Sequence, residues 1–285
     1  MIVEEARGIF SVPHSAAEGK NVIVLGEKAA VAIDVGTYPA EGRQMADFIR
    51  ERGYTPNRVI ITHGHRDHIL GGEAFRGSDV FAPRKTIDEI QRQIPSLCQQ
   101  LGLEAAEVEA RILHPTITFE NQLWIDLGNR QLHLFPTPGH SPDIVSIYIS
   151  DCRLLIASDT VVTGIVPAIF HSSAALEASI KGLKQLDIET LISGHGPVLH
   201  GQAVIQDWLN WTSRYISGVR SAVRSMIAAG ERDRGAILAA ISYDEYVGDR
   251  LPVDKHGMPK RHRNAVGKIA DEEMAASTGA RRHPP

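Results

Sequence analysis

The sequence predicts an α/β protein in which two β-sheets pack face to face between outer helices, an αββα sandwich, followed by a C-terminal helical extension. Two β-rich stretches, each with helical patterns attached, predict the sandwich, because paired sheets bury their apolar faces and leave the outer faces for helices. The pattern becomes mainly helical after Gly201. We therefore expect a main domain over residues 1–202 and a helical extension over residues 203–285.

The first β-rich half begins close to the N-terminus. Short apolar runs separated by glycine-containing turns are typical of strands. We expect strands at residues 8–12, 21–25, 29–34 and 58–62, with a helix from about 40 to 52 before the last of them. Residues 70–115 are mixed, with a strand at 80–81 and helical spacing of apolar residues around 87–94 and 108–112.

The second β-rich half follows Thr116. We expect strands at residues 123–125, 132–135, 144–149, 154–156 and 190–192, and helices at about 174–186, 203–229 and 236–241. In the helical extension, aromatic side chains recur at Trp208, Trp211, Tyr215 and Tyr243. Such a stripe favours a core, so the extension is expected to be a packing or dimerisation element, and the alternative is a lid over an apolar substrate group.

The composition narrows the class of protein. Apolar residues are 43% and charged residues 22% of the 285, which is typical of a globular protein with a sizeable core. The net charge of −4 gives no general attraction to nucleic acid or anionic lipid, and the short run 260–263 is expected to be a solvated basic face. With no basic-apolar N-terminal signal and no run of ~18 apolar residues, we expect a cytoplasmic protein with a small-molecule substrate.

Four candidate metal ligands follow the strand expected at residues 58–62. His63, His65, Asp67 and His68 lie within six residues, a density that packing does not explain. Imidazole and carboxylate groups suit zinc or iron, and alternating histidines on an extended loop can point to one centre while the next two residues face another. The alternative is a polar surface loop with incidental histidines.

Three more candidate ligands stand at the ends of later strand-like runs. His140 follows Thr137-Pro138-Gly139, Asp159 follows the run 154–158, and His195 lies between Gly194 and Gly196. Loops at strand ends commonly carry binding residues, because a rigid scaffold positions them. We therefore expect all seven side chains to converge on one site.

These motifs resemble the metallo-β-lactamase superfamily over about residues 8–200, with H-x-H-x-D-H matched in full at 63–68. The resemblance implies that one metal is held by His63, His65 and His140. It implies a second metal held by Asp67, His68 and His195, with Asp159 bridging the two. The implied cofactors are two divalent ions, zinc with iron or manganese as alternatives, and the implied nucleophile is a metal-bridging hydroxide of lowered pKa.

Two further residues are candidates for catalysis. Asp67 could orient the hydroxide or carry its proton to the leaving group. His171 follows Asp159 closely enough to enter the pocket and donate to an oxyanion, although a structural role is the alternative. The remaining histidines are expected to be surface or structural residues: His14, His114, His133, His200, His256, His262 and His283.

Departures from subfamily patterns bear on the substrate. The bridging Asp159 argues against true β-lactam hydrolases. Glyoxalase II and the persulfide dioxygenases resemble this chain, but their usual G-C-G-R stretch is replaced by residues 160–167, and the C-G-H-E-Y of the glutathione esterase is replaced by residues 193–197. The superfamily's lactonases and broad-range esterases look more similar, which favours a small ester, thioester or lactone.

Other functions stay open at this point. A mononuclear iron dioxygenase could use His63, His140 and Asp159 alone, and metal content with oxygen consumption would separate it from a hydrolase. A β-lactamase or phosphodiesterase activity is a further alternative. So is a binding protein that keeps the site as a relic, although a relic has no chemical need for seven ligands.

Overall fold

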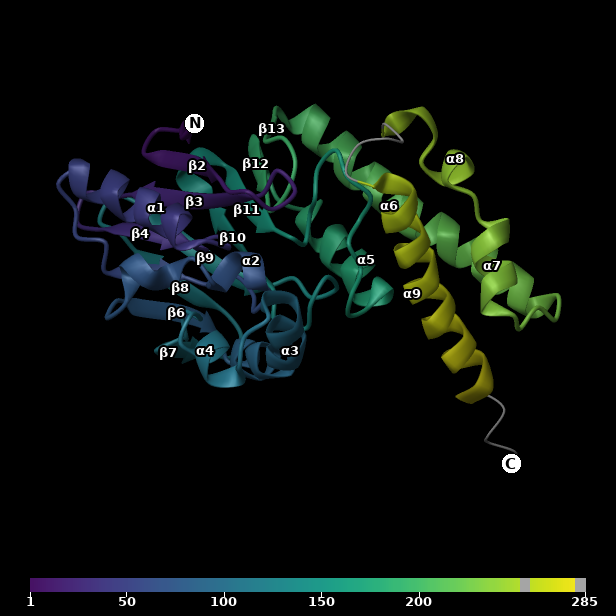
Figure 1. Ribbon diagram of the computed structural model, residues 1–285. Helices are drawn as coiled ribbons and strands as arrows, with labels where there is room; N and C mark the ends of the chain where they lie inside the picture. The colour runs from purple at the N-terminus through teal and green to yellow at the C-terminus, as the bar shows by residue number, and fades with distance from the viewer. Residues whose placement is uncertain (252–256, 280–285) are drawn as a thin grey trace.

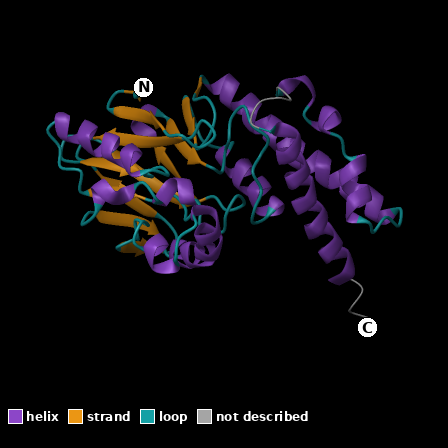
Figure 2. Cartoon of the chain, viewed as in Figure 1, coloured by secondary structure: helices purple, strands orange, loops and turns teal. Residues whose placement is uncertain are grey.

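The computed structural model describes residues 1–251 and 257–279, and this part of the chain has the αββα architecture that the sequence predicts (Figures 1 and 2). Within it, a seven-stranded sheet and a six-stranded sheet form the sandwich, and the C-terminal helices lie beside the sandwich at the right of Figure 1. His256 and His283 lie outside the described residues. No helix among the described residues is long and apolar enough to cross a membrane.

The first sheet has the strand order β1-β2-β3-β4-β5-β6-β7, antiparallel up to β4 and parallel from β4 to β7. Its strands are β1 (Val3–Ala6), β2 (Ile9–Pro13), β3 (Lys20–Leu25), β4 (Ala30–Ile33), β5 (Arg58–Ile60), β6 (Asp79–Pro83) and β7 (Ile117–Phe119). The connections supply α1 (Pro39–Glu51), α2 (Arg66–Ile69), η1 (Gly72–Phe75), α3 (Lys85–Leu101) and α4 (Ala105–Glu109). Parallel neighbours need such crossovers, which places helices on the sheet's outer face.

The second sheet has the order β13-β12-β11-β10-β9-β8, with β11 and β12 parallel and the other neighbours antiparallel. Its strands are β8 (Leu123–Asp126), β9 (Gln131–Pro136), β10 (Val145–Ile149), β11 (Leu154–Ser158), β12 (Thr190–Ser193) and β13 (Leu199–His200). A short 3-10 turn, η2 (Ser150–Cys152), joins β10 to β11, and α5 (Ser173–Leu183) lies in the crossover from β11 to β12.

Side-chain alternation along the strands divides the core into layers. In β3, Val22 and Val24 face the other sheet, whereas Ile23 packs under the helices of the first sheet. In β11, Ile156 faces inward and Leu155 packs under α5 and the helices that follow it. Strands buried on both faces are apolar almost throughout, as expected for central strands of a four-layer sandwich.

The helical extension continues the core of the second sheet. It comprises α6 (Gln202–Ala228), α7 (Arg234–Ala240), α8 (Tyr243–Tyr246), η3 (Gly248–Arg250) and α9 (Met258–Gly279). One buried apolar cluster runs from Leu155 in β11 through α6 to Ile269 in α9. Trp208, Trp211 and Tyr215 are buried in this cluster, which confirms the prediction that the aromatic stripe is core.

The basic run at 260–263 lies at the start of α9, and the prediction of a solvated face is wrong for its two middle residues. Lys260 and Arg263 are exposed, but Arg261 is half-buried and His262 is 3% exposed. His262 donates from Nε2 to the carbonyl of Ile241 and accepts at Nδ1 from the Tyr215 hydroxyl, both at 3.0 Å. Successive residues of a helix point about 100° apart, so four adjacent residues cannot share one face.

Candidate metal centre

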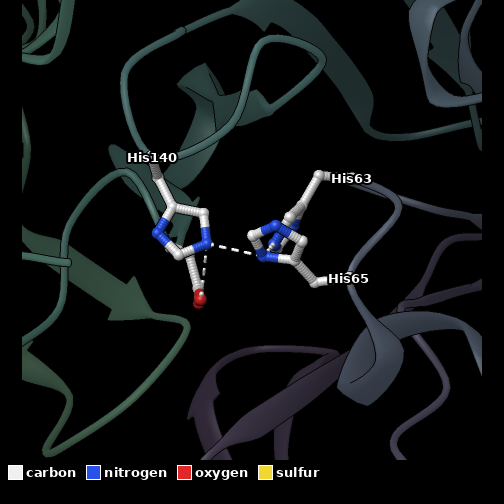
Figure 3. A group of neighbouring side chains, drawn as sticks. His63, His65 and His140 are labelled. Carbon is white, nitrogen blue, oxygen red and sulfur yellow. Dashed lines mark hydrogen bonds and ion pairs between the residues drawn. The ribbon is translucent and has the colours of Figure 1, made fainter. Parts of the chain in front are cut away.

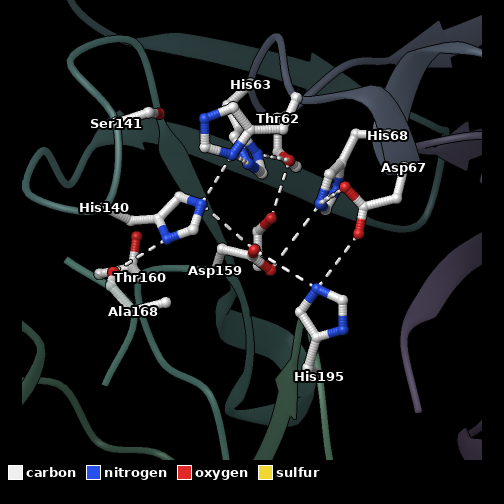
Figure 4. Close-up of polar contacts among 12 residues, drawn as sticks. Thr62, His63, Asp67, His68, His140, Ser141, Asp159, Thr160, Ala168 and His195 are labelled. Carbon is white, nitrogen blue, oxygen red and sulfur yellow. Dashed lines mark hydrogen bonds and ion pairs between the residues drawn. The ribbon is translucent and has the colours of Figure 1, made fainter. Parts of the chain in front are cut away.

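The seven predicted ligands come together at one edge of the sandwich, where strands of both sheets end. The loop after β5 carries His63 and His65 and runs into α2, which carries Asp67 and His68. The loops after β9, β11 and β12 carry the remaining three, which are His140, Asp159 and His195. Figure 4 shows six of these side chains facing a common space.

His63, His65 and His140 form the first group, the three-histidine cluster, together with Asp159. The Nδ1 atom of His65 lies 3.0 Å from Nε2 of His63 and 2.8 Å from Nε2 of His140 (Figure 3). Three ring nitrogens and a carboxylate oxygen, which lies 3.2 Å from Nε2 of His140, all lie within 4.8 Å of one another and form one face of a coordination shell.

Asp67, His68 and His195 form the second group, the Asp67 cluster. The Nε2 atom of His195 lies 3.3 Å from Oδ2 of Asp67, and Nε2 of His68 lies 3.9 Å from Oδ1 of Asp67. The two nitrogens and the carboxylate thus point toward a second centre.

Asp159 lies between the two clusters (Figure 4). Its Oδ2 atom is 3.2 Å from Nε2 of His140 in the first cluster and 3.4 Å from Nε2 of His195 in the second, while Oδ1 is 3.8 Å from Nε2 of His68. One carboxylate in contact with both sets of imidazoles is the arrangement expected of a bridging ligand.

Two buried polar atoms of the predicted ligands have no hydrogen-bond partner. They are Nε2 of His68 and Oδ1 of Asp159, which face each other across the site. An unsatisfied buried polar group costs about 1–3 kcal/mol, so the native fold rarely leaves one without compensation. Cations coordinated by these atoms would satisfy both, and the residues therefore fit a metal site.

The opposite ring nitrogens of the histidines are held by groups that the sequence analysis did not identify. Nδ1 of His140 lies 3.0 Å from the Ala168 carbonyl, and Nδ1 of His195 lies 3.1 Å from the Ala16 carbonyl. Nε2 of His65 lies 3.8 Å from the buried carboxylate of Glu89. Such outer partners fix the tautomer and orientation of each ligand.

Asp34 is the most connected of these outer groups. Its Oδ2 atom accepts hydrogen bonds from Nδ1 of His68 at 2.8 Å and from the Thr62 hydroxyl at 2.7 Å, and its Oδ1 atom accepts from the Thr62 backbone N–H at 2.8 Å. Asp34 has a left-handed backbone with φ of 58°. Aspartate and asparagine tolerate this conformation better than most residues, because their short polar side chains can bond locally.

We expect Asp34→Asn to lower metal affinity about tenfold. An amide has one acceptor oxygen, so it cannot accept from His68 at one position and from the Thr62 backbone N–H at the other, and outer partners of ligating histidines typically contribute tenfold or more. Asparagine keeps the left-handed backbone, so the secondary structure of the metal-free protein should not change, although its thermal unfolding midpoint should fall because the buried pair of Asp34 and protonated His68 is lost. Competitive zinc titration against a chromophoric chelator measures the effect. Unchanged affinity would show that Asp34 does not orient His68.

The two clusters differ in the proton affinity of their histidines. Burial lowers the pKa of all three histidines of the first cluster, with mutual repulsion adding to it, and the pKa of His65 falls to about 3. In the second cluster nearby carboxylates outweigh burial: Asp34 and Asp67 raise the pKa of His68 to about 9, and Asp159 and Asp67 raise that of His195 to about 11.

Metal binding is therefore expected to release protons mainly from the Asp67 cluster. At pH 7 the metal-free protein holds His68 and His195 protonated, and a cation requires neutral imidazole. Metal affinity at this cluster should therefore rise steeply with pH up to about 9, where His68 loses its proton, and less steeply up to about 11, where His195 does. Calorimetric zinc titrations at pH 7 in two buffers of different ionisation enthalpy count the protons. Equal release by the first and second equivalents of metal would contradict the expectation.

Two other histidines lie near the site. His171 has an exposed side chain, and its backbone N–H donates to the carbonyls of Gly139 and His140, so its contact with the site runs through the main chain; its predicted role as an oxyanion donor stays a prediction. His14 is buried, with its ring 5.8 Å from that of His195, and burial and His68 lower its pKa to about 4.

A cleft of about 510 Å³ opens over the two clusters. Its floor includes ligands of both clusters, and its walls come from α3, from the loop around Phe170 and from Arg261 of the helical extension. This volume lies within the ~300–1,000 Å³ that is usual for sites of small molecules. A small substrate can therefore reach both candidate metal positions.

The chain belongs to the metallo-beta-lactamase superfamily, whose family model matches residues 17–195. This confirms the resemblance drawn from the motifs. The probable metallo-hydrolase YqgX of Bacillus subtilis (strain 168) is 32% identical over 163 residues, which cover 55% of this chain and 76% of YqgX.

Two further curated relatives are hydrolases by name. The hydroxyacylglutathione hydrolase of Chelativorans sp. (strain BNC1) is 24% identical over 160 residues, 54% of each chain. The linear primary-alkylsulfatase of Pseudomonas sp. (strain ATCC 19151) is 21% identical over 222 residues, 64% of this chain and 42% of the sulfatase. The chain thus spans about half or less of these two proteins. The family and its relatives together support an enzyme with hydrolase activity.

Solved structures share the fold beyond the matched domain. The inverting sec-alkylsulfatase Pisa1 from Pseudomonas sp. superposes with a TM-score of 0.70 at 15% identity, covering 100% of this chain and 52% of the sulfatase. A metallo-beta-lactamase family protein from Thermus thermophilus superposes with a TM-score of 0.67 at 15% identity, covering 96% of this chain and 95% of that protein. The sandwich and the helices after it therefore recur together.

Proposed function

We propose that the protein is a dinuclear metal-dependent hydrolase of a small ester, thioester or lactone. The position of Asp159 carries the proposal, because one carboxylate contacts a histidine of each cluster and leaves an oxygen aimed at His68. Two metal positions joined by a shared ligand account for all seven side chains, whereas a single-metal dioxygenase would leave the Asp67 cluster without a role.

The chemistry divides between the metals and the chain. Divalent metal ions, when bound, supply Lewis acidity that activates water and polarises the substrate's carbonyl oxygen. The chain's own residues hold the geometry: Asp34 orients His68, and the Ala168 carbonyl orients His140. Asp67 lines the cleft beside His195, so its carboxylate can accept a proton from the attacking water and pass it to the leaving group.

Elemental analysis and a substrate panel test this proposal on the same protein sample, purified without added metal or chelator. We expect about two zinc, iron or manganese ions per chain and turnover of at least one member of a panel of p-nitrophenyl esters, acyl thioesters including a glutathione thioester, and lactones. One iron per chain with oxygen consumption and no hydrolysis would replace the proposal with the dioxygenase.

Hydrolysis of an alkyl sulfate ester is the second candidate function. Two observations favour it: the superposition on the alkylsulfatase Pisa1 covers 100% of this chain, and a second alkylsulfatase is a sequence relative. Release of inorganic sulfate from hexyl sulfate tests it directly. Sulfate release without ester turnover would make this the function in place of the carboxylic ester.

We also propose that the helical extension contributes a wall of the active-site cleft through its described residues. Arg261 lines the cleft although it lies far beyond the segment that carries the ligands. The buried cluster shared by β11, α6 and α9 holds this wall against the sandwich.

A further inference from the structure

A second chamber beneath α9 lies next to the cleft over the metal clusters. The chamber has a volume of about 270 Å³ and lies between the loop at residues 166–170 and the first turns of α9. Ala168, Phe170 and Arg261 line both the cleft and the chamber, so the two spaces adjoin at these residues. A ligand that reaches the metal clusters can therefore extend into the chamber.

The chamber has an apolar inner wall and a polar outer edge. Val166, Ile169 and Ala265 are buried and form the inner wall, whereas Lys260 and Asn264 are exposed and lie toward solvent. A hydrocarbon arm placed here would leave water for apolar contacts, so each further methylene group of the arm should tighten binding about fourfold.

Phe170 stands at the junction with 61% of its surface exposed. Its ring centroid lies 5.1 Å from that of His140 and 5.8 Å from that of His65. An aromatic ring in this place offers an apolar surface to a group that binds beside the two histidines. An apolar arm passing from the metal clusters into the chamber would cover this ring.

The charges around the two spaces are positive, although the whole chain has a net charge of −4. Arg66 and Arg261 line the cleft, and Lys260 and Arg261 line the chamber. Among the described residues that line either space, the acidic ones are Asp67 and Asp159, and both belong to the metal clusters. With metals bound, the two carboxylates serve as metal ligands, and Arg66 and Arg261 offer guanidinium N–H groups along the cleft, which suit an anion.

The helix that carries Arg261 is held on both sides. The neighbouring residue His262 is hydrogen-bonded to the Tyr215 hydroxyl of α6 and to the Ile241 carbonyl. Further along α9, the Glu272 carboxylate accepts from the backbone N–H of Ser173 at the start of α5 at 3.0 Å. A guanidinium on such a fixed helix binds an anion at lower entropic cost than one on a free loop.

We propose that the cleft and chamber bind one amphipathic anion, an ester with an apolar arm in the chamber and a negative charge next to the scissile bond, within reach of Arg261. The inference rests on the proposed function and names its substrate class. An alkyl sulfate and a half-ester of a dicarboxylic acid share this chemistry, and substrate turnover separates them.

Binding of hexane-1-sulfonate, which is not hydrolysed, tests the site without requiring activity. Isothermal titration calorimetry on the metal-loaded protein should show binding that Arg261→Gln weakens about tenfold, the usual contribution of a charge-assisted hydrogen bond. Arg263→Gln is the matched control, because Arg263 is on the same helix but lines neither space, and it should leave the affinity unchanged.

The alkyl length of the ligand tests the apolar chamber, and the charge of the ligand tests the anion site at Arg261. Hexane-1-sulfonate should bind at least about tenfold more tightly than propane-1-sulfonate, since three methylene groups enter the chamber. Hexan-1-ol should bind more weakly than hexane-1-sulfonate. Affinity that is independent of chain length, or equal for the alcohol and the sulfonate, would overturn the proposal.

The substrate that the enzyme cleaves shows whether the anion is a carboxylate or a sulfate. Monohexyl malonate and hexyl propanoate share the hexyl arm and a three-carbon acyl group, and they differ in a carboxylate next to the scissile ester. A site that recognises the carboxylate therefore gives the malonate a lower KM, which Arg261→Gln raises with little change in kcat. Preferred turnover of hexyl sulfate assigns the charge to the sulfate. If no ester is cleaved but hexane-1-sulfonate binds as expected, the proposed hydrolase function fails and the anion-binding site stands. If neutral esters are cleaved and Arg261→Gln has no effect on any substrate, the hydrolase function stands and the anion-binding site fails.

Discussion

Replacing Asp159 with alanine is expected to lower kcat/KM by about a thousandfold or more and to remove most of the bound metal. The carboxylate contacts histidines of both clusters, so its loss affects both metal positions and not one. A thousandfold loss corresponds to about 4 kcal/mol of transition-state stabilisation, the scale on which a bound metal acts. Metal content by elemental analysis and kcat/KM on the best panel substrate measure the effect.

The fold of this variant should stay intact. Asp159 lies in a loop after β11, and its removal also deletes a buried charge whose Oδ1 atom has no hydrogen-bond partner. Far-ultraviolet circular dichroism should match that of the wild-type protein stripped of metal. A variant that keeps two metals and wild-type turnover would disprove the bridging role.

Gly194→Ala is expected to lower kcat/KM by about a hundredfold or more without changing any ligand. A Cβ atom at residue 194 would overlap Oδ1 of Asp159 and would lie 2.8 Å from the carbonyl carbon of Ser158. The carboxylate must therefore move, and a displacement of about 1 Å at a reacting centre can reduce the rate by that factor. Kinetics and metal content of the same preparation measure the change.

Gly182→Ala is the matched control for this substitution. Gly182 is exposed near the end of α5, with no atom within 4 Å of a new Cβ, so alanine should leave activity unchanged and slightly favour the helix. If Gly194→Ala retains full activity, the space between Asp159 and the β12 loop is less restricted than these distances indicate.

The ligand loop was predictable because its information is local. His63, His65, Asp67 and His68 follow a predicted strand and lie within six residues of sequence. This local signal needs no knowledge of the rest of the fold. The short apolar runs likewise predicted the central strands. Edge strands β1, β7 and β13 were missed, because they are two to four residues long and partly exposed, which leaves little apolar pattern to detect.

Groups that act through tertiary contacts were not predictable in the same way. Glu89 lies on a helix whose sequence shows only an amphipathic pattern, and its contact with His65 depends on how α3 packs. Arg261 reaches the cleft because α9 folds back over the loop at 166–170. Asp34 had a weak signal, since it ends a strand-like run just before Gly36, as the recognised ligands end theirs.

The ligands come from both sheets, and this has a consequence for unfolding. His63 follows a strand of the first sheet, whereas His140 and Asp159 follow strands of the second, so a bound cation would cross-link the two halves of the sandwich at one edge. A ligand present at a hundred times its dissociation constant stabilises the native state by about 2.7 kcal/mol. Chelation should thus loosen the docking of one sheet on the other first, and metal supply becomes a determinant of how long the protein survives proteolysis.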